Sequence, residues 1–347
     1  MADRQASDPE LAAIMRAVGC RPAWAAVALV ALLAVVAAAL DVAATLPPWV
    51  RYLPLAASLL LFGLPHGAVD HLAPPRAAGR PTAPRWMALV GVAYLLLGGG
   101  YAVLWTVAPV VSAALFVALT WFHWGQGDLY ALDALGADHL DGRGVRAGTL
   151  LVRGGLPMLV PLLAHPERYR QVVDAWVSLF GRHLALSVTV DARLGLGVAF
   201  AAVTAATLLA GYRRADGPAW RHDAVETLSL WVYFLVVPPL VAIGVYFCLW
   251  HSLRHIARLI GIDRDGARVA FVERGAVAAL LRTGREAAPL TGLSVVLLVG
   301  AGVVVGIETV PGRLAALYLV FIAVLTLPHV AVVTWMDRAE RDGTVKG

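Results

Sequence analysis

Histidine is the residue type through which this sequence is best equipped to do chemistry. The chain has ten histidines and two cysteines among its 347 residues. Six histidines lie inside strongly apolar stretches, where an ionisable side chain is costly and usually functional. These six are His66, His71, His123, His251, His255 and His329. The other four, His139, His165, His183 and His222, fall in the connections, where solvated or interfacial positions are expected.

The spacing of the apolar histidines suggests a metal site. His251 and His255 are four residues apart in the sequence WHSLRH. Four residues turn a helix by about 400°, so both imidazoles leave one face and can chelate one ion. His66 in GLPHGAVDH and His123 in WFHWGQGD are the candidates for additional nitrogen ligands, and His329 in LPH is a secondary candidate.

The types of ligand atom limit which metals and which reactions are expected. Neutral imidazoles without a cysteine thiolate suit iron, zinc, copper or nickel. Asp70 follows His66 by four residues, and Asp128 follows His123 by five. Either carboxylate could accept the second N–H of a ligand histidine, or could be a solvated acid at a helix end. His71 could take the same supporting role. No nucleophile elbow, phosphate loop or paired carboxylates accompany these residues, which favours O₂ chemistry over hydrolysis.

The composition places these residues in a membrane protein. Hydrophobic residues make up 60% of the chain and charged residues only 15%, and the mean hydropathy is +0.74. A disordered chain is excluded, and an ordinary soluble domain does not fit. The net charge is +5, but only one of the 28 basic residues is a lysine, so we expect no nucleic-acid partner. Arginines in the cytoplasmic loops of a membrane protein explain the positive net charge better than nucleic-acid binding does.

The predicted fold class is an all-α, polytopic transmembrane helix bundle of about ten spans, with eight as the lower bound. Pro238 and Pro239 break the helical run between the seventh and eighth of these spans. The expected spans are 24–44, 52–72, 86–107, 109–131, 147–164, 193–212, 224–237, 239–260, 290–308 and 313–336.

Charge distribution sets the expected orientation. With the N-terminus in the cytoplasm, most of the 28 basic residues fall in inside connections, so both termini are predicted to be cytoplasmic. We expect a single integral membrane domain over 1–347, with 1–21 as a cytoplasmic N-terminal segment. Residues 261–288 are expected to form a cytoplasmic amphipathic segment, and 165–192 an interfacial helix.

This topology brings the candidate ligands to a common depth. Their spans, the second, fourth, eighth and tenth, all run from outside to inside. Counted at 1.5 Å per residue from the span starts, the histidines agree in depth to within about 6 Å. A metal site in the bundle core requires such an arrangement. Tryptophans, tyrosines and phenylalanines cluster on the same spans and favour an apolar substrate, and nearby glycines leave room beside the ligands or pack helices.

The motifs GLPHGAVDH, WFHWGQGD and WHSLRH, in this order, resemble those of the Brp/Blh family of membrane β-carotene 15,15′-dioxygenases, over about residues 50–335. The resemblance implies an oxidoreductase of the cell membrane that cleaves the central double bond of β-carotene with O₂, giving two molecules of retinal. It also implies a functional link to a microbial rhodopsin. The implied cofactor is non-haem Fe(II), with His66, His123, His251 and His255 as its ligands.

Three other functions remain open from the residues. A membrane di-iron desaturase or hydroxylase fits the HxxxH and HxxxxH spacings, although the chain has no HxxHH box. A b-type haem electron carrier would place histidines opposite each other across helices. A histidine-containing transporter would bind and move a solute without catalysing a reaction. A metal content near one per chain disfavours the first, and the absence of a Soret band disfavours the second.

Overall fold

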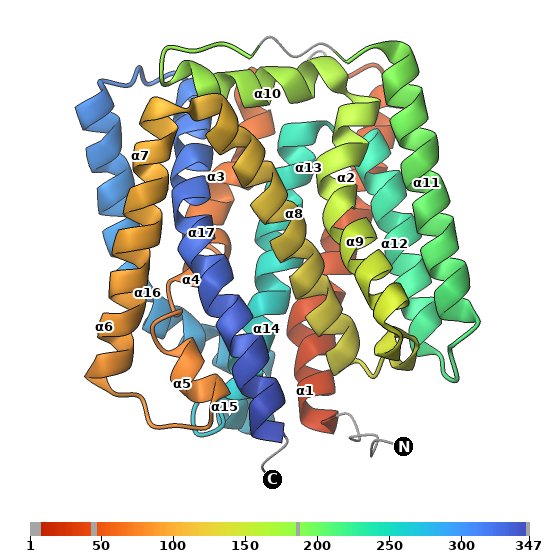
Figure 1. The fold of residues 1–347 in the computed structure, drawn as a ribbon, viewed down its shortest axis with the longest axis vertical. Coiled ribbons are helices and arrows are strands. Elements are labelled where there is room, and N and C mark those ends of the chain that lie inside the picture. The colour runs from red at the N-terminus through yellow and green to blue at the C-terminus, as the bar shows by residue number, and fades with distance from the viewer. Residues whose placement is uncertain (1–7, 43–46, 185–187, 345–347) are drawn as a thin grey trace. The chain divides into compact units, whose positions relative to one another are not determined.

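Helices are the only regular secondary structure in the described part of the chain. The computed structural model (Figure 1) describes residues 8–42, 47–184 and 188–344. The longer helices are α2 (Arg21–Ala39), α6 (Pro84–Ala93), α7 (Gly99–Val107), α8 (Pro109–Ala134), α9 (Arg143–Ala164), α10 (Pro166–Ser178), α11 (Val190–Tyr212), α12 (Ala219–Val236), α14 (Ser252–Ile262), α16 (Ala276–Val305) and α17 (Pro311–Thr344). The shorter ones are α1 (Pro9–Ile14), α3 (Leu53–Leu60), α4 (Gly63–Gly67), α5 (Ala73–Ala77), α13 (Pro239–Val245) and α15 (Ala267–Arg274). Three linking segments are π-helical: Met15–Cys20, Tyr94–Gly98 and Tyr246–His251.

The all-α class is confirmed, and seven helical stretches in the described residues are long and apolar enough to cross a membrane. They overlap seven of the ten expected spans, but two of them begin well before the predicted start, at Pro9 instead of residue 24 and at Ala276 instead of residue 290. Segment 109–131 lies in the continuous helix α8, and all but the last residue of 224–237 lies in α12. The polar side chains of both segments lower their hydropathy. The seven stretches are Pro9–Ala39, Pro84–Val107, Arg143–Ala164, Val190–Tyr212, Pro239–Ile262, Ala276–Val305 and Pro311–Glu340.

The prediction of one continuous helix over 52–72 is wrong. α3 ends at Leu60, α4 begins only at Gly63, and the chain then turns through residues 68–72. Pro65 lacks a backbone N–H and Gly63 favours helix weakly, so an unbroken helix is disfavoured here. His66 therefore lies on a five-residue helix. A depth counted along a straight helix from residue 52 does not apply to it.

The chain divides into two compact units. Unit 1 comprises residues 1–50, 121–169 and 186–258, and unit 2 comprises 51–120, 170–185 and 259–347. In unit 1, α9 contacts both α11 and α12, and α2 contacts α12. Figure 1 shows α9, α11 and α12 side by side. The C-terminal end of α8 belongs to a buried apolar cluster of Leu129, Leu132, Ala137, Leu140 and Val145.

Glycine allows α8 and α9 to approach closely within unit 1. A Cβ atom on Gly154 would lie 1.9 Å from the backbone oxygen of Trp121. A Cβ atom on Gly125 would lie 2.3 Å from the backbone oxygen of Leu150. Both distances are far shorter than van der Waals contact, so only glycine fits. Of the two roles open to Gly125, helix packing is the one it fills.

We expect Gly154→Ala to lower the free energy of unfolding by about 1–3 kcal/mol. The added methyl group would overlap the backbone oxygen of Trp121, which can shift only if helix α8 shifts with it. Gly144→Ala is the matched control, since it lies on the same helix with no heavy atom within 4 Å of its Cβ position. Thermal unfolding of the detergent-solubilised protein measures both. Equal melting temperatures for the two variants would contradict the close approach.

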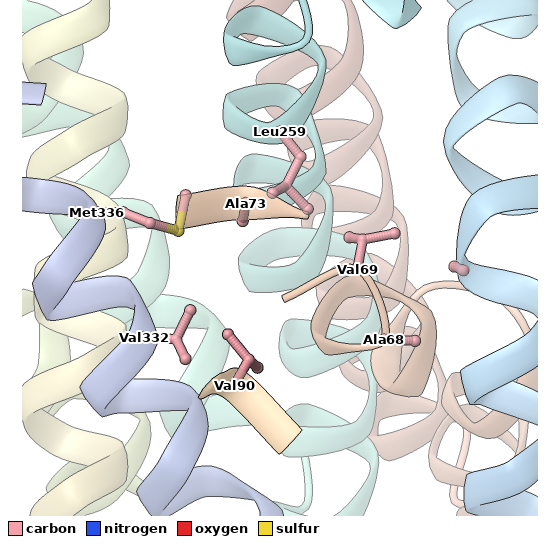
Figure 2. Close-up of a cluster of buried hydrophobic side chains, with 8 residues drawn as sticks. Ala68, Val69, Ala73, Val90, Leu259, Val332 and Met336 are labelled. Carbon is pink, nitrogen blue, oxygen red and sulfur yellow. The ribbon is translucent and has the colours of Figure 1, made fainter. Parts of the chain in front are cut away.

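Unit 2 is built on contacts of α17 and α16. α17 contacts α5, α7 and Tyr94–Gly98, and α16 contacts α4 and α15. Figure 2 shows Val332 of α17 facing Val90 of α6 within the unit's apolar core. This core fixes the turn that follows α4. Its buried members are Ala68, Val69, Ala73, Val90, Leu259, Ala287, Val332 and Met336.

Both long connections contain helix. α10 occupies the first half of 165–192, as the prediction of a helix there requires. In 261–288, α15 is followed by Gly275, whose φ of 84° only glycine adopts readily, and then by α16. Val272 and Val277 are exposed beside Arg274. The location of this segment at a membrane surface stays a prediction.

Candidate metal centre

The histidine pair of WHSLRH lies where one helix changes its hydrogen-bond pattern. Residues Tyr246–His251 are π-helical, and the α-helical turns of α14 begin at Ser252. π-helical turns insert a residue into a helix and are frequent at functional sites. His251 and His255 are both buried, at 2% and 5% exposure. Both imidazoles are therefore held inside unit 1, about one α-helical turn apart.

α8 brings His123 to the same place. The ring centroids of His123 and His251 are 4.7 Å apart, with the rings inclined at 71°. His123 is 3% exposed, and its Nδ1 lies 3.4 Å from the side-chain oxygen of Gln126. Two of the predicted ligands thus meet across separate helices within unit 1, with His255 one turn further along α14.

The surroundings of His251 are apolar and closely packed. Its ring lies 5.8 Å from that of Trp124 and 6.5 Å from that of Phe247. A Cβ atom on Gly127 would lie 3.3 Å from two atoms of the His251 ring. Gly127 therefore leaves room for a candidate ligand. Aromatic side chains therefore pack around the His251 ring.

Unit 2 holds the other two histidines. The rings of His66 on α4 and His329 on α17 are 5.0 Å apart and nearly perpendicular, at 89°. Both are buried, at 6% exposure. His66 Nδ1 donates to the backbone oxygen of Gly63. Because a carbonyl oxygen only accepts, the proton is on Nδ1 and the lone pair is on Nε2.

Asp70 is hydrogen-bonded to His329. One oxygen, Oδ2, accepts from His329 Nδ1 at 2.7 Å and from the Tyr94 hydroxyl at 2.6 Å. Asp70 is 2% exposed, so a solvated acid at a helix end is excluded for it. His71, in the turn after α4, is half-buried. The predicted histidines therefore form two sets: His123, His251 and His255 in unit 1, and His66 and His329 in unit 2.

Asp128 is also buried, but its partners are not histidines. It is 1% exposed and accepts from Trp250 Nε1 at 3.1 Å and from Arg254 at 3.0 Å. Arg153 Nη1 lies 3.4 Å from its other oxygen. The guanidinium of Arg254 also lies 4.1 Å from the centroid of the Trp250 ring. Asp128 thus ties α8 to the residues that flank His251 and His255.

Sequence reasoning missed most of this buried ion network. Arg153 contacts Glu226 at 2.6 Å and Asp223 at 3.0 Å, and Arg254 also donates to Glu226. All these charged side chains are at most 3% exposed. The available signal was the presence of Arg153, Asp223 and Glu226 inside or beside apolar stretches, where unpaired charges are not tolerated.

His139 corrects the expectation of solvated loop histidines. It is 1% exposed, and its Nε2 lies 3.0 Å from Asp223. His139 therefore belongs to the ion network. His183, with a side chain 81% exposed, does match the expectation.

A second group of donor atoms in unit 1 is already engaged. One ligand atom each from Cys20, His222 and Glu226 lies within 4.8 Å of the others. Glu226 accepts from Trp24 at 2.7 Å in addition to its two arginines. Two guanidinium groups beside the carboxylate oppose a cation there. This group is part of the ion network.

Comparison with known proteins identifies the family. The family model described as β-carotene 15,15′-dioxygenase matches residues 57–337. The chain is 54% identical over 325 residues to "Probable beta-carotene 15,15'-dioxygenase Blh" of Halobacterium salinarum, covering 91% of each protein. It is 33% identical over 305 residues to "Probable beta-carotene 15,15'-dioxygenase Brp" of the same species, covering 81% of this chain and 82% of that protein.

No solved structure matches the chain. The family assignment therefore rests on sequence, over a match that contains all five buried candidate histidines. The chain belongs to the β-carotene 15,15′-dioxygenase family.

Proposed function

We propose that the chain cleaves the 15,15′ double bond of β-carotene with O₂ at a non-haem Fe(II), giving two molecules of all-trans-retinal. The observation that carries the proposal is membership of the β-carotene 15,15′-dioxygenase family, which assigns the substrate and the class of reaction. The proposed iron ligands are His66, His123, His251 and His255.

The residues fit the metal. Imidazole nitrogens, the donor atoms of both histidine sets, suit Fe(II). His66 has its Nδ1–H held by a carbonyl oxygen, which leaves Nε2 as the donor nitrogen. Asp70 Oδ1 is buried without a hydrogen-bond partner among the described residues, as expected beside a positive ion. When bound, the iron would bind and activate O₂ next to the polyene.

The protein groups have separate tasks. The imidazoles hold the metal with neutral donors, so the ion keeps its positive charge. Trp124 and Phe247 line one side of His251 and exclude water, which suits a hydrocarbon substrate. The ion network around Asp128 holds α8 and the helix of His251 and His255 together. None of its members is proposed to touch the substrate.

The proposal requires one iron per chain. This requirement separates it from a di-iron desaturase, which needs two ions. We expect an iron content near one per chain in the purified protein, with no Soret band.

We further propose that the chain is a multi-pass protein of the cytoplasmic membrane, with about ten spans and both termini in the cytoplasm. The seven apolar helical stretches, α8, α12 and the broken α3–α4 pair would provide them. The arginine-rich inside connections support this orientation. β-Carotene would then enter from the lipid bilayer, and the retinal formed could supply a microbial rhodopsin.

Expression in a β-carotene-producing bacterium tests the function. We expect the orange colour to fade and retinal to accumulate, because the substrate is consumed at its central bond. Extraction and chromatography of the retinoids measure the product. An orange culture that contains folded, iron-loaded protein and no retinal would contradict the proposal.

A further inference from the structure

A tyrosine that no sequence motif singled out is joined to the histidines of unit 2. The Tyr94 hydroxyl lies 2.6 Å from Oδ2 of Asp70, and the same oxygen lies 2.7 Å from Nδ1 of His329. The His329 ring lies edge-on to His66, at 5.0 Å. Tyr94, Asp70 and His329 thus form one continuous hydrogen-bonded chain that ends beside a proposed ligand.

The backbone around Tyr94 is unusual. Tyr94 opens the π-helical segment Tyr94–Gly98 between α6 and α7. A π-helical turn holds one more residue than an α-helical turn and so redirects the side chains on it. At the other end of the segment, a Cβ atom on Gly98 would lie 3.5 Å from the backbone oxygen of Val324 on α17. The segment therefore packs closely against the helix that carries His329.

The position of Asp70 is fixed by packing. Its backbone N–H donates to Gly67, and its carbonyl oxygen accepts from Ala73. Val69 and Ala73, on either side, belong to the apolar core that includes Val332 of α17 (Figure 2). The carboxylate is therefore held against α17 by the core as well as by its hydrogen bonds.

The direction of these hydrogen bonds follows from the donors available. A carboxylate oxygen only accepts, so both the tyrosine hydroxyl and His329 Nδ1 donate to it. The proton of His329 is then on Nδ1, and its lone pair is on Nε2. Carboxylates that hold the N–H of a ligand histidine fix the ring and make it a stronger donor.

We propose that Tyr94 is a positioning residue: through Asp70 it fixes the orientation and the Nδ1–H tautomer of His329, so that Nε2 of His329 is presented to the iron. The inference rests on the iron proposed above and extends it to His329. Tyr94 itself touches neither iron nor substrate. Without the Tyr94 hydroxyl, the Asp70 carboxylate loses one of the two donors that hold it in place, and only His329 Nδ1 remains.

Tyr94→Phe tests the proposal with no change in ring shape. We expect the variant to bind Fe(II) about 10–100-fold more weakly, the usual effect of removing a partner that orients a metal ligand. Tyr101→Phe is the matched control. Tyr101 is buried in the same unit, and its hydroxyl donates at 2.7 Å to the backbone oxygen of Ser112 instead of to Asp70. This control should bind iron as the wild type does.

A double variant separates positioning from general stabilisation. In a His329→Ala background, Tyr94→Phe should cause no further loss of iron affinity, because the residue through which it acts is gone. A second single variant, Asp70→Asn, should weaken iron binding at least as much as Tyr94→Phe. Wild-type iron affinity in Tyr94→Phe, or an equal loss with and without His329, would overturn the inference.

Iron titration of the purified protein needs no carotenoid, so it is independent of the reaction. If the wild type binds iron and Tyr94→Phe weakens it, but no retinal is formed, the inference stands and the proposed function fails. A wild-type chain that binds no iron overturns both.

Discussion

Replacing His251 by alanine is expected to abolish both iron binding and retinal formation. The His251 ring lies 4.7 Å from that of His123, and His251 ends the π-helical segment that leads directly into α14, which carries His255. The substitution therefore removes a nitrogen from the centre of the unit 1 set. The loss should exceed the roughly 10–100-fold that removal of an orienting partner causes, because a ligand itself is gone. Iron content of the purified protein and retinoid chromatography measure the two effects.

His183→Ala is the matched control for this experiment. Its side chain is 81% exposed, and its ring nitrogen lies 3.4 Å from Asp174. It should keep wild-type iron content and retinal yield. His139→Ala is unsuitable as a control, since His139 is buried against Asp223 in the ion network. Retinal formation at the wild-type rate by His251→Ala would remove His251 from the ligand set.

The sequence predicted the helical class and the burial of five histidines, because both depend on composition and local spacing, but it did not predict the burial of His139. The five are His66, His123, His251, His255 and His329. Apolar runs long enough to cross a membrane imply helices, and histidines inside such runs are usually functional. The meeting of His123 and His251 could not be predicted, since the face that each helix turns inward depends on packing. The break between α3 and α4 had a visible signal in Gly63 and Pro65.

Two features had no local signal. A π-helical segment such as Tyr94–Gly98 differs from an α-helix by a shift in hydrogen bonding that leaves the apolar pattern almost unchanged. The ion network joins residues far apart in the chain, such as Asp128 and Arg254. Charge inside a span shows that a partner must exist, but it does not identify the partner.

Replacing Asp128 by asparagine is expected to cost about 3–5 kcal/mol of unfolding free energy, the usual result of removing one partner of a buried ion pair. Arg254 and Arg153 would both lose their contact with this carboxylate, and each is at most 2% exposed. Water cannot replace the lost charge at these positions. Thermal or chemical unfolding of the solubilised protein measures the change.

Asp133→Asn is the matched control on the same helix. Asp133 pairs with Arg146 at 2.5 Å, but their side chains are 39% and 43% exposed. An exposed pair contributes about 0–1 kcal/mol, so this variant should unfold close to the wild type. The two substitutions remove the same charge from α8 and differ in whether solvent reaches the site.

The Asp128 variant should also bind iron more weakly, whereas the Asp133 variant should not. Asp128 accepts from Trp250 and Arg254, the residues next to His251 and His255 in the sequence. Without the carboxylate charge, the helix of His251 and His255 loses the ion pair of Arg254 with α8, which carries His123. The imidazoles should then be held less firmly in a common geometry. If Asp128→Asn unfolds and binds iron as Asp133→Asn does, solvent reaches the charges, and the network does not hold the metal-binding helices together.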